Sequence, residues 1–135
     1  MISSGDVVLP AAVTDRAAAR VAGEADEDAV LGRGLHLIRP DPRRVDSWFL
    51  AGFLTGPANI QQASYGTSVT RVDVRRLIVP LLPLPMQREY GVAFRQLHDY
   101  AVATRDFAAR SADLTELLSR SLADGVLLPG GGVQW

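Results

Sequence analysis

The side chains most often used for acid–base or metal chemistry are scattered along this sequence. His36 and His98 lack partner residues at the spacing of a metal site, so a packed or surface position suits each of them better. The acidic residues at 24–28 follow one another closely, as in a solvated turn. No serine lies in a nucleophile elbow, and the chain has no cysteine. We therefore expect no catalytic site and no metal site in this chain.

Arginine is the residue type through which this chain could recognise a ligand. All 14 basic residues are arginine, a composition that a GC-rich genome also favours. The formal net charge is −1, but residues 31–80 hold seven arginines and three acidic residues, a local sum of +4. Residues 1–30 and 81–135 sum to −4 and −1. A basic middle segment indicates an anionic partner, although an ordinary mixed surface would give the same count.

The elements that must hold these arginines are organised around residues 77–128. Three closely spaced prolines keep residues 77–85 extended, so a helix can begin only near Pro85 or Met86. From there to Asp124 the only glycine is Gly91, and apolar or small residues recur at spacings of three and four. This stripe comprises Tyr90, Phe94, Leu97, Ala101, Thr104, Phe107, Ser111, Leu114, Leu118 and Leu122.

The length of this helix predicts a partner for its distal half. About 39 residues would span roughly 58 Å, more than a small domain can cover. The partner would be another copy of this helix, a second helix elsewhere in a longer protein or a neighbouring subunit. Of these we expect a homodimer, in a coiled coil or similar pairing. The predicted interface residues are Tyr90, Phe94, Leu97, Phe107, Leu114, Leu118 and Leu122. The alternative is a helix broken near Gly91 or near residues 108–109 into a hairpin.

The residues before the helix predict a small, bent β-sheet with short helices, and hence an α+β fold ending in one long C-terminal amphipathic helix. Expected strands lie at 7–9, 17–21, 30–31 and 34–39, followed by a helix from Asp46 or Ser47 to Leu54 and a short helix at 58–64. Gly66 is expected to cap that helix, with a polar loop at 66–68 and a helical or turn segment at 69–76.

The expected domain organisation has three parts. Residues 1–80 form a partial α+β domain, residues 81–125 the proline segment and long helix, and residues 126–135 a flexible tail. Neither a signal peptide nor an apolar stretch long enough to cross a membrane is visible, so we expect a cytoplasmic protein without membrane contact.

The order of these signals resembles that of a known family. The features are the Gly5-Asp6 turn before a strand, the strand at 35–39, the segment Asp46 to Leu54, the Gly66-Thr67-Ser68 loop, and the proline-rich segment that ends at Gln87. Together they resemble the target-recognition domains of type I restriction-modification specificity subunits, in the form found at the C-terminus of some bacterial N-6 adenine DNA methylases. Met86 stands where the family usually has an acidic residue.

The resemblance implies a non-catalytic DNA-recognition module whose long helix sets spacing or docks on the methylase catalytic domain. The adenine-methylase tetrapeptide and a cofactor-binding glycine motif are absent, so the chain looks like the C-terminal piece of a larger methylase, and S-adenosylmethionine is expected only in the catalytic domain. By matching position, the expected contacts to duplex DNA are Gly66, Thr67, Ser68 and Arg71, with Arg75 and Arg76 on phosphates. The alternative is a dimerisation or assembly module of the methylase without DNA binding of its own.

Overall fold

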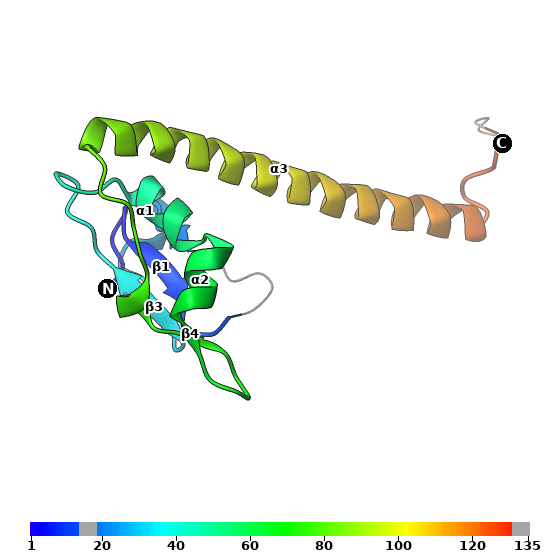
Figure 1. The fold of residues 1–135 in the computed structure, drawn as a ribbon. Coiled ribbons are helices and arrows are strands. Elements are labelled where there is room, and N and C mark those ends of the chain that lie inside the picture. The colour runs from blue at the N-terminus through cyan, green and yellow to red at the C-terminus, as the bar shows by residue number, and fades with distance from the viewer. Residues whose placement is uncertain (14–18, 131–135) are drawn as a thin grey trace. The chain divides into compact units, whose positions relative to one another are not determined.

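The computed structural model describes residues 1–13 and 19–130, and it has the expected α+β class (Figure 1). Small antiparallel sheets and short helices precede one long C-terminal helix. The chain forms two compact units, Met1–Arg95 and Gln96–Trp135. The boundary between them falls inside the long helix, later than the expected boundary after residue 80. The first turns of that helix therefore belong to the N-terminal unit.

Strand β1 (Val7–Pro10) is the centre of the main sheet, between β2 (Arg20–Val21) and β3 (Leu35–Ile38). Both neighbours are antiparallel to it, with Val7 opposite Val21 on one side and Ile38 on the other. The predicted strands at 7–9 and 34–39 are thus confirmed. Residues 17 and 18 of the strand expected at 17–21 lie outside the described residues.

The strand expected at 30–31 does not form. The chain turns just before it, because the Ile2 amide donates to the Ala29 carbonyl and the Asp28 amide donates to the Ile2 carbonyl. Asp28 adopts a φ of 63°, a left-handed conformation that does not occur in an extended strand. The acidic turn predicted at 24–28 is present as a short 3₁₀ helix, η1 (Glu24–Asp26).

Helix α1 (Ser47–Leu54) begins as predicted, with Asp46 as its N-cap. The Asp46 carboxylate accepts a hydrogen bond from the Phe49 amide at 2.9 Å. The helix packs on β1, and together they form a core of buried apolar side chains: Val7, Leu50, Ala51 and Leu54. Burial of this kind is the main favourable contribution to the fold.

Helix α2 (Pro57–Ala63) is followed directly by a β-hairpin made of β4 (Ser64–Tyr65) and β5 (Arg71–Val72). The expectation that Gly66 caps the helix is wrong. The C-cap is Ser64, and Gly66 lies in the hairpin loop with a φ of 103°. The segment expected to be helical or turn at 69–76 is partly strand, β5, and partly a 3₁₀ helix, η2 (Val74–Arg76).

Residues 77–83 belong to no helix and pair with no strand among the described residues, and Leu77 has extended backbone angles. Leu84 and Pro85, which were also expected to be extended, belong to the helix that follows. Pro80 and Pro83 have no amide hydrogen, which prevents a regular ladder here. Helix α3 (Leu84–Ala123) then runs without interruption, so the alternative of a broken helical hairpin is wrong.

No helix among residues 1–13 and 19–130 is long and apolar enough to cross a membrane. Residues 131–135 of the expected C-terminal tail lie outside the described part of the chain.

Candidate functional site

The residues predicted to contact DNA fall on one hairpin and the turn that follows it. Gly66, Thr67 and Ser68 lie in the loop between β4 and β5, Arg71 lies on β5, and Arg75 and Arg76 lie on η2. The structure therefore brings together, in one region of the N-terminal unit, the six residues that the sequence singled out.

Backbone hydrogen bonds attach this hairpin to the main sheet. The segment just after β1 bridges the two sheets: the Ala11 carbonyl accepts from the Val72 amide and the Val13 amide donates to the Thr70 carbonyl, both at 2.8 Å. The Ala11 amide donates to the Gly34 carbonyl, also at 2.8 Å, at the start of β3. These bonds place β5 beside the beginning of β3.

An open groove of about 580 Å³ lies between these elements. Besides Arg71, Arg75 and Arg76, its lining includes His36 of β3 and Tyr65 of β4. No sequence pattern marks Tyr65 or His36 as part of a site, because the pairing that brings them beside the arginines is not local in sequence. Tyr65 is directly opposite Arg71 in the hairpin register, so their side chains share a face.

Helix α2 holds the turn that carries Arg75 and Arg76. The Asp73 amide donates to the Ala63 carbonyl at 2.9 Å, and Gln62 Nε2 donates to the Arg76 carbonyl at 2.6 Å. The Asn59 side chain accepts from the Ile78 amide at 2.9 Å. The backbone of this turn is therefore fixed, while the guanidinium groups extend from it.

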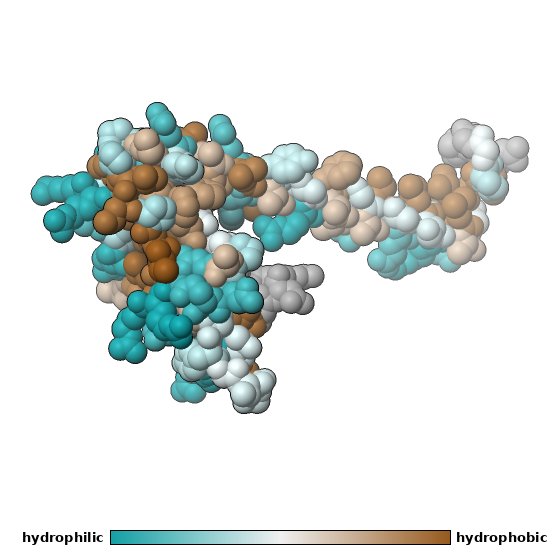
Figure 2. All heavy atoms as spheres, in the orientation of Figure 1, coloured by the Kyte–Doolittle hydropathy of each residue, from teal (hydrophilic) through white to brown (hydrophobic). Residues whose placement is uncertain are grey.

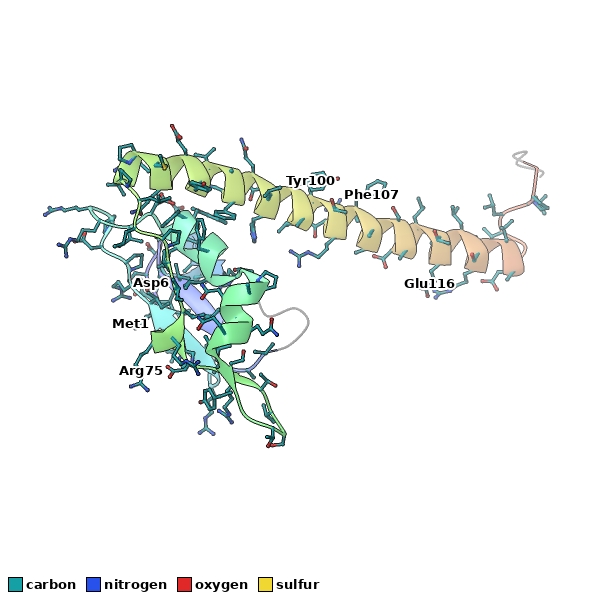
Figure 3. All side chains as sticks on the ribbon, in the orientation of Figure 1. Met1, Asp6, Arg75, Tyr100, Phe107 and Glu116 are labelled. Atoms are coloured by element: carbon teal, nitrogen blue, oxygen red, sulfur yellow. The ribbon has the colours of Figure 1, made fainter. Side chains whose placement is uncertain are left out.

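The three arginines of the groove have little internal charge compensation. The Arg75 side chain is 92 % exposed, extends from the edge of the N-terminal unit (Figure 3), and approaches Asp73 at a long 3.4 Å. An exposed pair of this kind is weak and breaks easily. In the described part of the chain, the side chains of Arg71 and Arg76 form no ion pair. Three guanidinium groups are thus available to an anionic ligand such as phosphate.

Compared with protein-family models, curated proteins and solved structures, the chain matches none of them.

Two of the predicted helix-interface residues pack against α1 within the N-terminal unit, although Tyr90 remains 43 % exposed. Tyr90 and Phe94, on the first turns of α3, contact Phe53 of α1 with ring centroids 5.6 Å apart in both pairs. The close approach of the two helices requires glycine: a Cβ atom on Gly52 would overlap the Phe94 ring. The sequence pattern identified an apolar stripe, but it did not show that its first part covers the chain's own α1.

Gln87 has a structural role in this junction. It is 6 % exposed, and its Oε1 accepts from the Asp46 amide at 3.0 Å. Its Nε2 donates to the Leu82 carbonyl at 2.9 Å and to the Arg44 carbonyl at 3.3 Å. One side-chain amide therefore ties the end of the proline-rich segment, the start of α1 and the first turn of α3 together.

The remaining predicted interface residues are solvent-exposed in the distal part of α3: Leu97, Phe107, Leu114, Leu118 and Leu122. Figure 3 shows Tyr100 and Phe107 on one side of the helix and Glu116 on the other. Figure 2 shows hydrophobic residues gathered along one side of this segment. Phe107 is 74 % exposed, an unusual environment for a large aromatic side chain.

Two ion pairs lie in the region around the N-terminus. Asp6 is buried, accepts from the Ser3 amide, and forms a bidentate pair with Arg39 at 2.6 and 2.8 Å. The hydrogen bonds from Arg39 hold the pKa of the Asp6 carboxyl below its ordinary value. Arg20 similarly lowers the pKa of the partly exposed Asp26 to about 2. Within residues 1–13 and 19–130, no group of three or more acidic or histidine side chains is placed to hold a metal ion.

Proposed function

We propose that this chain is a DNA-recognition module of an N-6 adenine DNA methylase of the type I kind, without catalytic activity of its own. The observation that carries the proposal is the groove lined by Arg71, Arg75 and Arg76 beside an exposed hairpin. In protein–DNA complexes, arginines fix the protein on the phosphates, while residues that enter a groove recognise the bases. S-adenosylmethionine would bind the catalytic domain that such a module serves.

Salt dependence of binding to a mixed-sequence duplex tests this proposal. Each phosphate contact releases counterions, so the logarithm of the binding constant falls with the logarithm of salt with a slope of about −0.9 per contact. We expect Arg71→Ala, Arg75→Ala and Arg76→Ala each to weaken binding and to reduce that slope by about 0.9. Arg105→Ala, which removes the same charge from the exposed surface of α3, is the matched control and should leave the slope unchanged.

Two results of this binding experiment would contradict the proposal. A duplex bound equally well by the parent and the three groove variants would contradict the proposal, as would no binding by the parent at low salt. The exposed apolar residues of distal α3 favour a second candidate function, an assembly module that pairs with another copy of the chain. That module would show a concentration-dependent mass but no affinity for duplex.

A further inference from the structure

The hairpin between β4 and β5 is the element of the groove best shaped to enter DNA. Only Ser64 with Val72 and Tyr65 with Arg71 are paired, so residues 66–70 form a loop beyond the ladder. Figure 1 shows this loop projecting from the N-terminal unit next to β4. All of its residues are exposed. The major groove of duplex DNA, about 12 Å wide and about 8.5 Å deep, admits a two-stranded β-ribbon of this kind.

The length of the loop decides which residues would reach the bases. Ser68 is at the tip, and Arg71 is three positions further along the strand. An extended chain advances about 3.3 Å per residue, so the backbone of Arg71 lies at most roughly 10 Å behind the tip, a distance comparable with the depth of the groove. With the tip at the base edges, Arg71 lies at the level of the phosphates. Arg75 and Arg76 are in the same lining and extend that phosphate-binding surface.

The tip carries one apolar side chain among hydroxyls. Thr67 and Ser68 can exchange hydrogen bonds with water or bases, whereas Val69 is 54 % exposed and gains nothing from water. The apolar group that the major groove presents is the C5-methyl of thymine. We propose that Val69 is a specificity-determining residue that contacts a thymine methyl group in the major groove, while the three groove arginines bind the flanking phosphates. This inference rests on the proposed DNA-binding function.

Gly66 lies close to the backbone of Val69 in the loop. It adopts a φ of 103°, which L-residues with a side chain rarely adopt, and a Cβ atom there would lie 2.5 Å from the Val69 carbonyl oxygen. The turn is therefore closed tightly onto the backbone of Val69. A defined loop conformation is what a residue needs in order to contact one base rather than many.

Selection from a pool of random duplexes, followed by replacement of thymine with deoxyuridine, tests this inference. The replacement removes only the methyl group. At each thymine of the selected duplex, binding is compared for the parent, Val69→Ser and the control Val30→Ser. Val30 is another exposed valine, with 84 % of its surface accessible, and it lies away from the hairpin. At one thymine we expect deoxyuridine to weaken the binding of the parent and of the control about fourfold, which is the effect of one buried methyl group. The binding of Val69→Ser should weaken less than about twofold at that position.

The outcomes separate this inference from the proposed function. The role of Val69 is overturned if binding depends on salt but no thymine is selected, or if deoxyuridine weakens the binding of the parent and of Val69→Ser equally. Either result is compatible with the proposed DNA-binding function. A parent that binds no duplex at low salt overturns both. Retained affinity of Val69→Ser for the unselected pool is expected, because the phosphate-binding arginines are unchanged, and it shows that the variant is folded.

Discussion

Gly91 of α3 lies against the carboxylate of Asp46, so closely that a Cβ atom at position 91 would overlap Asp46 Oδ1. That oxygen also accepts the Phe49 amide and so caps α1. On the opposite side of the contact, Gly52 of α1 lies against the Phe94 ring, and a Cβ atom at position 52 would overlap that ring. Each helix thus contributes one glycine at the point where the other presents a side chain, and this arrangement fixes how α1 and the first turns of α3 dock.

We expect Gly91→Ala to destabilise the protein, although alanine is the better helix former by about 1 kcal/mol. The added methyl must displace the Asp46 carboxylate, which removes a helix cap worth about 1 kcal/mol and overpacks the contact at a further cost of about 1–3 kcal/mol. Urea denaturation measures the net change. Gly23→Ala is the control, since a Cβ there would meet no atom within 4 Å. Equal stability of both variants would show that the helices do not approach as described.

Gln87→Met should lower the free energy of unfolding by about 2–4 kcal/mol, as an order of magnitude. Methionine fills a similar volume, but it leaves the Asp46 amide and the Leu82 carbonyl without their partner. Gln96→Met, on the exposed surface of α3, is the matched control and should change stability little. A Gln87→Met variant as stable as the control would mean that water replaces the lost hydrogen bonds.

The Asp6–Arg39 pair predicts a dependence of stability on acid pH. Because the pKa of Asp6 is lower in the folded state than in the unfolded chain, its contribution is complete above about pH 4 and is lost as the pH falls through the folded-state pKa. Asp6→Asn should therefore be less stable at neutral pH and should lose less stability on acidification. Thermal melts between neutral and acid pH, with Asp113→Asn as an exposed control, measure both effects. An unchanged acid dependence in Asp6→Asn would contradict this role.

If the distal part of α3 pairs with a second copy, Leu118→Asp should dissociate it, because a carboxylate buried without a partner costs several kcal/mol. Ala109→Asp is the matched control. Position 109 lies about 180° from position 118 around the helix, at 100° per residue, so its charge would remain in solvent. Sedimentation equilibrium of the two variants and the parent gives the masses. A parent that stays monomeric, or a Leu118→Asp variant with the parent's dimeric mass, would remove this interface.

The parts of the fold that the sequence predicted well are those governed by local rules. Asp46 marks the start of α1, and the prolines before Met86 mark the start of α3 to within two residues. The β4–β5 hairpin was missed because each strand has only two residues, too few to show alternation. Gly66 was misinterpreted because a positive φ serves a helix C-cap and a hairpin loop equally well.

The residues of the candidate site came from their positions in the resemblance, and their contact with DNA stays a prediction. Arg71, Arg75 and Arg76 are close in sequence, and the structure places them in one groove lining. His36 joins them only through the bridge that Ala11 makes between the sheets, which no local pattern encodes. Tyr90 and Phe94 illustrate a different difficulty. An apolar stripe predicts that a face is covered, and only the packing of Gly52 and Gly91 shows that α1 covers it.

The docked start of α3 also has a consequence for how the rest of the helix forms. Only Gln87 and Gly91 of this helix are buried, and both lie in its first turns. Forming the first turn is the unfavourable step of helix formation, with an equilibrium factor of about 10⁻³, whereas each added residue is close to neutral. The contacts of Gln87, Tyr90 and Phe94 with the N-terminal unit supply that nucleus. Amide protection in the isolated chain should therefore decline steadily from Arg95 towards Ala123, and association along the exposed leucines would raise it at the distal end.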